Sequence, residues 1–194
     1  MNNRIFAFLL LGSIYLSSCQ KDAVKPTITL AAVPQKTITT SQVITPDTTN
    51  SNINGYLRLQ LAEDSVNTDN ILIDFKPTAK ITYSPSEDAP TFQGFGAVSL
   101  SSISSDNIAL AINTLPLTNK GLTVGLKVNA KTDGVYSLKM VTIKSVPATY
   151  HLWLMDKYKK DSLDFRYNSK YAFNIYKADT SSFGSHRFKL VIRQ

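Results

Sequence analysis

The side chains that could carry out catalysis are few in this chain of 194 residues. His151 and His186 fall in separate alternating segments and form neither an HxH nor an HExxH motif, so we predict no metal site. Serines are plentiful, but the Gly-x-Ser-x-Gly motif that presents a nucleophilic serine on a sharp turn is missing. The acidic pairs at 63–64 and 87–88 are each adjacent in turn-like sequence, where carboxylates are usually solvated. We therefore expect neither enzymatic activity nor a cofactor, and a small hydrolase is the weakest of three hypotheses.

The only cysteine, Cys19, is placed for a different kind of chemistry. It ends the sequence Leu16-Ser17-Ser18-Cys19, which follows Arg4 and an apolar run over residues 5–16. These residues resemble the bacterial lipobox, and the resemblance implies that residues 1–18 are a lipoprotein signal peptide and that Cys19 is acylated. The run is shorter than the roughly twenty apolar residues that span a bilayer. An ordinary secretory signal with a chance cysteine and a buried core helix are the alternatives.

Lipidation of Cys19 would fix the location and the covalent chemistry of the mature chain. Gln20-Lys21-Asp22 resembles the charged export tags of lipoproteins displayed on the outer face of some outer membranes. We therefore expect a lipid-anchored outer-membrane protein that faces the cell exterior. No thiol would remain for a disulfide, so the folded part must be held together by its core.

Composition divides the mature chain into a tether and a domain. Residues 19–54 are rich in threonine and proline and lack aromatic side chains, so they have little apolar surface to offset the entropy of ordering. From Gly55 to Gln194, short segments alternate between apolar and polar residues, as in half-buried strands. We predict a lipidated tether over 19–54 and an all-β domain over 55–194.

The strand pattern best suits an antiparallel two-sheet sandwich of about nine or ten strands. The turn at Asp133-Gly134 separates two alternating runs and predicts a β-hairpin. The segments 150–155 and 188–192 are apolar on both faces, or nearly so, as in central strands or strands beneath a partner.

Several segments together resemble the β-sandwich module of large surface and adhesin-like proteins from gliding Gram-negative bacteria. They are Ser84–Gly96, Ala109–Pro116, Gly134–Tyr136, Leu152–Lys157, Tyr171–Phe173 and Arg187–Leu190. The resemblance covers most of residues 55–194 and implies a sandwich fold, but it carries no catalytic residues. In those relatives a C-terminal sorting domain usually follows, whereas here the lipid on Cys19 would retain the protein at the surface. The family pattern also implies that Asp156, which ends one strand, pairs with Arg187, which opens the last one.

The C-terminal part of the chain is basic and aromatic. Residues 157–194 hold nine lysines and arginines against three aspartates, a net charge of +6 out of +7 for the whole chain. Such a region attracts acidic polysaccharide, lipid phosphate or nucleic acid, of which nucleic acid is the least expected on an exported protein; a merely solvated face is the alternative. Core packing explains most of the aromatic side chains in this region. We expect Trp153, Tyr158, Tyr167 and Tyr176 to remain outside as ligand contacts.

Three short sequences resemble O-glycosylation acceptors of exported proteins in such bacteria and would be modified at Thr48, Ser65 and Ser162. The leading functional hypothesis is a noncatalytic outer-membrane lipoprotein that displays a β-sandwich for adhesion, envelope organisation or complex assembly. The alternative is a glycan-binding accessory lipoprotein of a polysaccharide-uptake system. The expected partners are the membrane, through the lipid, and either a glycan or another envelope protein.

Overall fold

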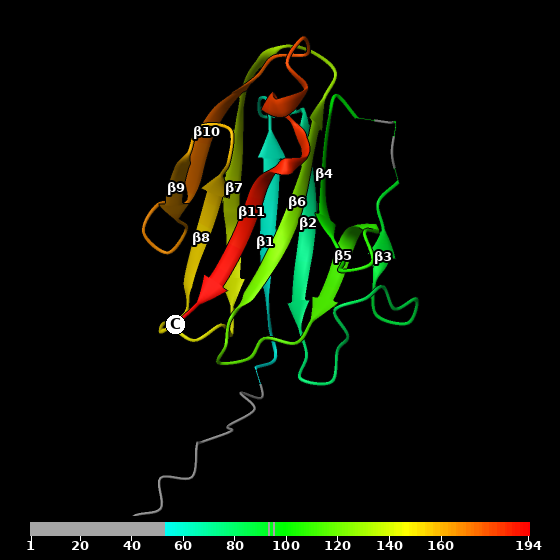
Figure 1. Cartoon of the computed structure of the whole chain (residues 1–194), viewed down its shortest axis with the longest axis vertical. Helices are drawn as coiled ribbons and strands as arrows, with labels where there is room; N and C mark the ends of the chain where they lie inside the picture. The colour runs from blue at the N-terminus through cyan, green and yellow to red at the C-terminus, as the bar shows by residue number, and fades with distance from the viewer. Residues whose placement is uncertain (1–52, 93, 95) are drawn as a thin grey trace, which may run out of the picture. The chain divides into compact units, whose positions relative to one another are not determined.

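The alternating segments form β-strands in the computed structural model, which describes residues 53–194 except 93 and 95 (Figure 1). In the described part the strands are β1 (Gly55–Ala62), β2 (Thr68–Phe75), β3 (Ala89–Pro90), β4 (Val98–Ile103), β5 (Ala109–Leu115), β6 (Leu122–Ala130), β7 (Gly134–Lys144), β8 (His151–Asp156), β9 (Asp161–Asp164), β10 (Lys170–Ile175) and β11 (Gly184–Arg193). A single 3-10 turn, η1 (Thr180–Ser182), precedes β11. Among these residues no helix has the length and apolar character that crossing a membrane requires.

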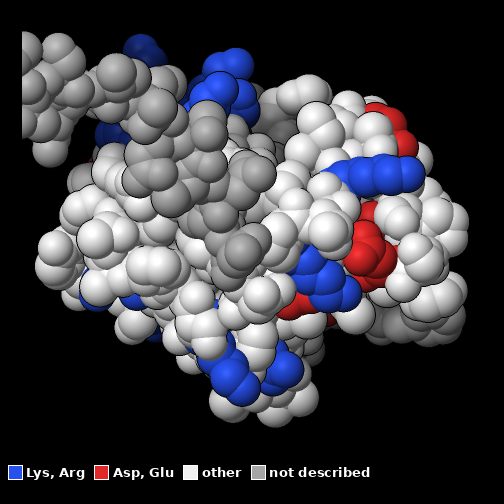
Figure 2. Space-filling view, turned by 90° about the horizontal axis from the view of Figure 1, so that it is seen from below, with Lys and Arg blue, Asp and Glu red and all other residues white. Residues whose placement is uncertain are grey.

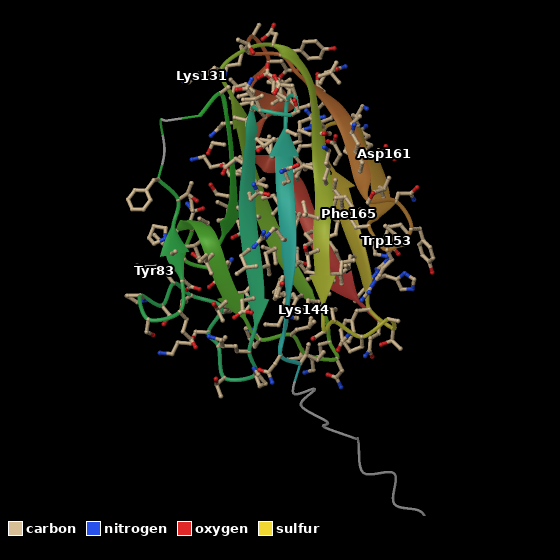
Figure 3. The ribbon with its side chains drawn as sticks, turned by 180° about the vertical axis from the view of Figure 1, so that it is seen from behind. Tyr83, Lys131, Lys144, Trp153, Asp161 and Phe165 are labelled. Atoms are coloured by element: carbon tan, nitrogen blue, oxygen red, sulfur yellow. The ribbon has the colours of Figure 1, made fainter. Side chains whose placement is uncertain are left out.

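All the strands belong to one hydrogen-bonded sheet. Its order is β10-β7-β1-β2-β5-β4-β6-β11-β8-β9, and β3 pairs with β5 beside this path. The sheet curls so that β6, β11 and β8 lie in front of β7, β1 and β2 (Figure 1), and the view from behind reverses the two layers (Figure 3). The strands of both layers contribute to a single hydrophobic core.

The all-β class is confirmed, but the predicted arrangement of the strands is wrong in two respects. β2 and β5 are parallel, with Leu72 opposite Ile112, so the sheet is mixed rather than antiparallel. The two layers are also not separate sheets, because β5 connects them by pairing with both β2 and β4. The result is a nearly closed, barrel-like sheet rather than a clear two-sheet sandwich.

The hairpin predicted at Asp133-Gly134 does not form. β6 pairs with β4 and β11, whereas β7 pairs with β1 and β10, so the turn carries the chain from one layer to the other. Asp133 accepts a hydrogen bond from the backbone N of Lys177 at 2.6 Å, and the Lys177 Nζ donates to the carbonyl of Ala130. These long-range contacts determine the geometry of the turn in place of strand pairing.

Alternation accounts for the core. Leu57, Leu59 and Leu61 are fully buried on β1, and the polar residues between them face outward. Ile53, two residues before β1, also belongs to the core although it lies within the stretch predicted as tether. The two strands that are apolar on both faces, β8 and β11, lie next to each other in the interior of the sheet order. Their outer faces therefore form a broad surface.

Candidate ligand-binding face

The outer side of β8 and β11 lies between two polar centres, one at each end of β8. Asp156 is the last residue of β8 and His151 is the first. The four aromatic residues expected to contact a ligand divide between these ends: Tyr158 and Tyr176 lie toward Asp156, and Trp153 and Tyr167 lie toward His151.

At the first end, Asp156 and Arg187 form a completely buried ion pair. The Arg187 Nη2 lies 2.8 Å from the Asp156 Oδ2 and its Nε lies 3.1 Å from Oδ1, with no exposed area on either side chain. The guanidinium carbon is 4.7 Å from the ring centroids of both Phe173 and Phe188 and 4.9 Å from that of Tyr158. The pair that the resemblance implied is therefore present, in a bidentate geometry that suits a desolvated site.

The remaining hydrogen-bonding groups of this pair are also used. Arg187 Nη1 donates to the carbonyls of Asn174 and Ser182, and Asp156 Oδ1 accepts from the backbone N of Tyr158 and Lys159. A ligand would have to break these bonds to reach either charge. We conclude that the pair stabilises the fold.

Tyr171 extends this network across the gap between the edge strands β9 and β10. Its hydroxyl donates to Asp156 Oδ2 and to Asp161 Oδ2, both at 3.2 Å. Burial, together with the two carboxylates, raises the pKa of Tyr171 well above its usual value, so the hydroxyl keeps its proton. Side chains thus join two strands that share no backbone ladder.

Tyr158 and Tyr176 contribute to the cover of this centre. The hydroxyl of Tyr158 is hydrogen-bonded to Asp179, and this bond, followed by partial desolvation and the charge of Asp179, raises the pKa of Tyr158. The backbone N of Tyr176 donates to the Ser182 Oγ. Both rings are partly exposed, at 39% and 46%, but the Tyr158 ring is already in contact with the arginine. The buried pair itself is therefore less accessible to a ligand than His151 is.

At the other end, His151 lies between two rings. Its ring centroid is 6.2 Å from that of Trp153, nearly parallel, and 6.2 Å from that of Tyr167. Tyr167 is 77% exposed, and the His151 side chain is 41% exposed. We call these three side chains the aromatic platform. Figure 3 shows Trp153 and Asp161 on one side of the molecule and Tyr83 on the opposite side.

Asp164 holds the platform in place from below. Its Oδ2 lies 2.6 Å from the His151 Nδ1, and its Oδ1 accepts the backbone N of Leu152 at 3.1 Å and of Arg166 at 2.9 Å. Burial opposes the charged form, but these three hydrogen bonds outweigh it and lower the pKa of Asp164 below its ordinary value of 3.8. A charged Asp164 favours the tautomer in which Nδ1 carries the proton, which leaves Nε2 as the ring atom for a ligand.

Several cations of the basic C-terminal part have structural roles. Arg166 donates to the carbonyls of Val146, Pro147 and Tyr150, and Lys177 lies 4.1 Å from the Phe183 ring centroid. With Arg187, three of the nine basic residues are therefore committed to the fold. At the end of the molecule seen in Figure 2, basic and acidic side chains stand beside one another instead of forming one basic patch.

The residues considered for catalysis do not converge. His151 pairs in register with Arg193 at one end of β11, whereas His186 lies near the other end. Asp88 accepts hydrogen bonds from the backbone N of Ser84 and of Thr114, which places it in a structural loop. Within residues 53–194, apart from 93 and 95, no group of three or more His, Cys, Asp and Glu side chains could hold a metal ion.

The expected modification sites divide between the described and undescribed parts of the chain. Ser162 is exposed on β9, and Ser65 is exposed in a turn where Asp64 accepts the backbone N of Val66 and of Asn67. Cys19, Thr48 and the segments 1–18 and 19–52 lie outside the described residues.

Two members of the His151 centre could not be recognised from single motifs. Asp164 and Arg166 are 13 and 15 positions from His151, and nothing nearby in sequence marks them. The available signal is the register of the β8–β9 hairpin, in which Asp156 lies opposite Asp161 and Trp153 lies opposite Asp164. Comparisons with protein-family models, curated proteins and solved structures gave no match.

Proposed function

We propose that this chain is a noncatalytic outer-membrane lipoprotein that displays an all-β module at the cell surface for adhesion, envelope organisation or complex assembly. The lipobox-like sequence ending at Cys19 supports the anchor and the location. The segments that resemble the β-sandwich modules of surface and adhesin-like proteins support a module of this kind.

The observation that carries a binding role is the outer face of β8. Met155 on β8 is 42% exposed, and Tyr167, whose ring lies 6.2 Å from that of His151 on the same strand, is 77% exposed. Exposed apolar and aromatic groups that lie together mark interaction sites more often than scattered ones do. Asp164 also holds the His151 ring of the platform in one orientation, which reduces the entropy that a partner must overcome on binding.

The anchor and its orientation are tested with Cys19→Ala in the native host. We expect the natural protein to remain in the envelope fraction and to be cut when intact cells are treated with protease. The variant should lose its lipid and leave the envelope. If the variant stays just as firmly bound and is processed at the same bond, the lipid anchor is wrong; protection of the natural protein on unbroken cells would mean that it faces the periplasm.

A second candidate function is glycan binding in a polysaccharide-uptake system, and the aromatic platform favours it. Flat rings with a nearby polar donor suit the apolar face and hydroxyl edge of a sugar. A glycan array should show saturable binding that Trp153→Ala abolishes and Tyr83→Ala, on the opposite side of the molecule, preserves (Figure 3). Equal binding by the natural protein and both variants would exclude the platform as a glycan site.

A further inference from the structure

The outer face of the sheet contains a groove that crosses the strands. A hollow of about 580 Å³ lies over β6, β11 and β8, and its lining includes Thr123, Met155, Lys157, Lys160, Lys189 and Val191. It shares Thr123 and Lys189 with a hollow of about 370 Å³ toward β4, where Ile103 and Gly125 form part of the wall. It shares Lys157 and Arg187 with a third, of about 620 Å³, toward η1. The three hollows adjoin one another at these shared residues, and we call them together the lysine groove after Lys157, Lys160 and Lys189.

The strand register connects the lysine groove to the aromatic platform. Lys189 lies opposite Met155, and Val191 lies opposite Trp153. Because alternate residues of a strand point to the same side, Trp153 and Met155 share one face of β8. A chain-like ligand could therefore follow the lysines and continue over the Trp153 ring.

The charge in the groove is largely unneutralised. None of Lys157, Lys160 and Lys189 forms an ion pair with any described residue. The lining also holds Asp156, whose charge is taken up by Arg187, and Asp161, which is the one remaining carboxylate. The adjoining hollow adds the charge of Lys127. The excess positive charge selects an anionic ligand.

Apolar side chains in the lining of the groove restrict the class of ligand further. Met155 and Val191 offer apolar surface between the lysines. A small inorganic anion would use the charge but not this surface. A sugar ring that bears an acidic group offers both an anionic edge and a face of C–H bonds.

We propose that the lysine groove binds an acidic polysaccharide, with the sugar acids on the lysines and one sugar face on the aromatic platform. This inference rests on the binding role proposed above and names its ligand class. Carboxylate and sulfate groups would both satisfy the lysines, so the experiment includes a polymer of each kind.

The test compares two double variants of the full mature lipoprotein in detergent. Lys157→Gln/Lys189→Gln removes two charges from the groove. Lys139→Gln/Lys170→Gln removes two charges from β7 and β10, where these lysines lie directly opposite each other in register. Binding of polygalacturonate, dextran sulfate and uncharged dextran is measured by calorimetry at low and physiological salt.

We expect the natural protein to bind at least one of the two acidic polymers and not dextran. The groove variant should weaken that binding at least tenfold and reduce its salt dependence, while the control variant should change it less than twofold. Preference between the acidic polymers identifies carboxylate or sulfate as the recognised group. Unchanged thermal midpoints would show that both variants are folded.

Two results would overturn the inference. Equal losses in the two variants would mean that only net charge matters. Failure of the natural protein to bind either acidic polymer at low salt would exclude acidic polysaccharides as the ligand class. If the glycan array then showed binding of neutral glycans, the proposed binding role would remain. If it showed no binding at all, the proposed glycan-binding function would be excluded as well.

Discussion

The two ends of β8 carry the same kind of pair in opposite environments. At one end an aspartate holds Arg187, and at the other an aspartate holds His151. The Arg187 side chain has no exposed area, whereas that of His151 is 41% exposed. Both aspartates are buried, so the difference lies in the exposure of their partners.

This difference separates a structural role from a binding role. Arg187 uses its donors on Asp156, Asn174 and Ser182 and is covered by three rings, so little of it is left for a ligand. His151 makes one hydrogen bond to its aspartate, and 41% of its side chain is exposed. The comparison predicts that changes to the buried Asp156–Arg187 pair affect folding, and that changes to the exposed side chains around His151 increasingly affect binding alone.

Asp156→Ala should have the largest effect. It leaves Arg187 buried without its counter-ion, and removal of one partner from a buried pair typically costs about 3–5 kcal/mol. Urea denaturation of the mature chain gives the free energy of unfolding directly. Asp156→Ala/Arg187→Met should recover part of the loss, because no uncompensated charge remains in the core.

An Asp156→Ala variant with an unchanged thermal midpoint would contradict this role for the pair. The double variant provides the control: if it were no more stable than the single one, the loss would come from packing and not from the isolated charge.

Asp164→Ala should have the next largest effect. It removes two bonds to backbone N–H groups and one to His151, and hydrogen bonds to charged groups contribute roughly 1.5–3 kcal/mol to stability. His151→Ala keeps both backbone bonds and should cost less in the same denaturation experiment. If the two variants were equally destabilised, the backbone bonds of Asp164 would be irrelevant to the hairpin.

The sequence predicted some parts of this comparison and not others, for physical reasons. Alternation identifies inward residues such as Leu57, because burial of one face imposes a period of two. The pair of Asp156 and Arg187 was expected only because the resemblance to the surface-protein module implied it. Asp164 and His151 could not be paired, because their contact depends on the register of a hairpin. The hairpin predicted at Asp133-Gly134 was wrong because turn residues allow a hairpin but do not determine which strands pair. Long-range contacts decide that pairing.

The parallel pairing of β2 with β5 was equally inaccessible from the sequence. Residues 76–108 separate the two strands, and this stretch contributes β3 and β4 to the same sheet. The alternation within β2 and β5 is the same for parallel and antiparallel neighbours. Strand content was therefore predictable, whereas the closure of the sheet was not.

The dependence of stability on pH should distinguish Asp164 from its surroundings. Its pKa is lowered in the folded protein, so its contribution is complete above the ordinary value of 3.8 and is lost as the pH falls through the folded value. Asp164→Asn should therefore reduce the free energy of unfolding most at neutral pH, and the difference from the natural protein should shrink below about pH 4. A difference that stays constant down to pH 2 would show that packing, and not the carboxylate charge, accounts for the role of Asp164.

Tyr167→Ala should have the smallest effect on folding and a clear effect on binding. The ring is 77% exposed, and substitutions at such positions usually change stability by less than about 0.5 kcal/mol. Loss of the ring removes one side of the aromatic platform, so affinity for any ligand that lies across His151 should fall while the unfolding curve stays in place. Tyr176→Ala, at the Arg187 end and 46% exposed, is the matched control. If Tyr176→Ala weakened binding as much as Tyr167→Ala, the aromatic platform would not be the specific ring contact, because Tyr176 belongs neither to the platform nor to the lining of the lysine groove.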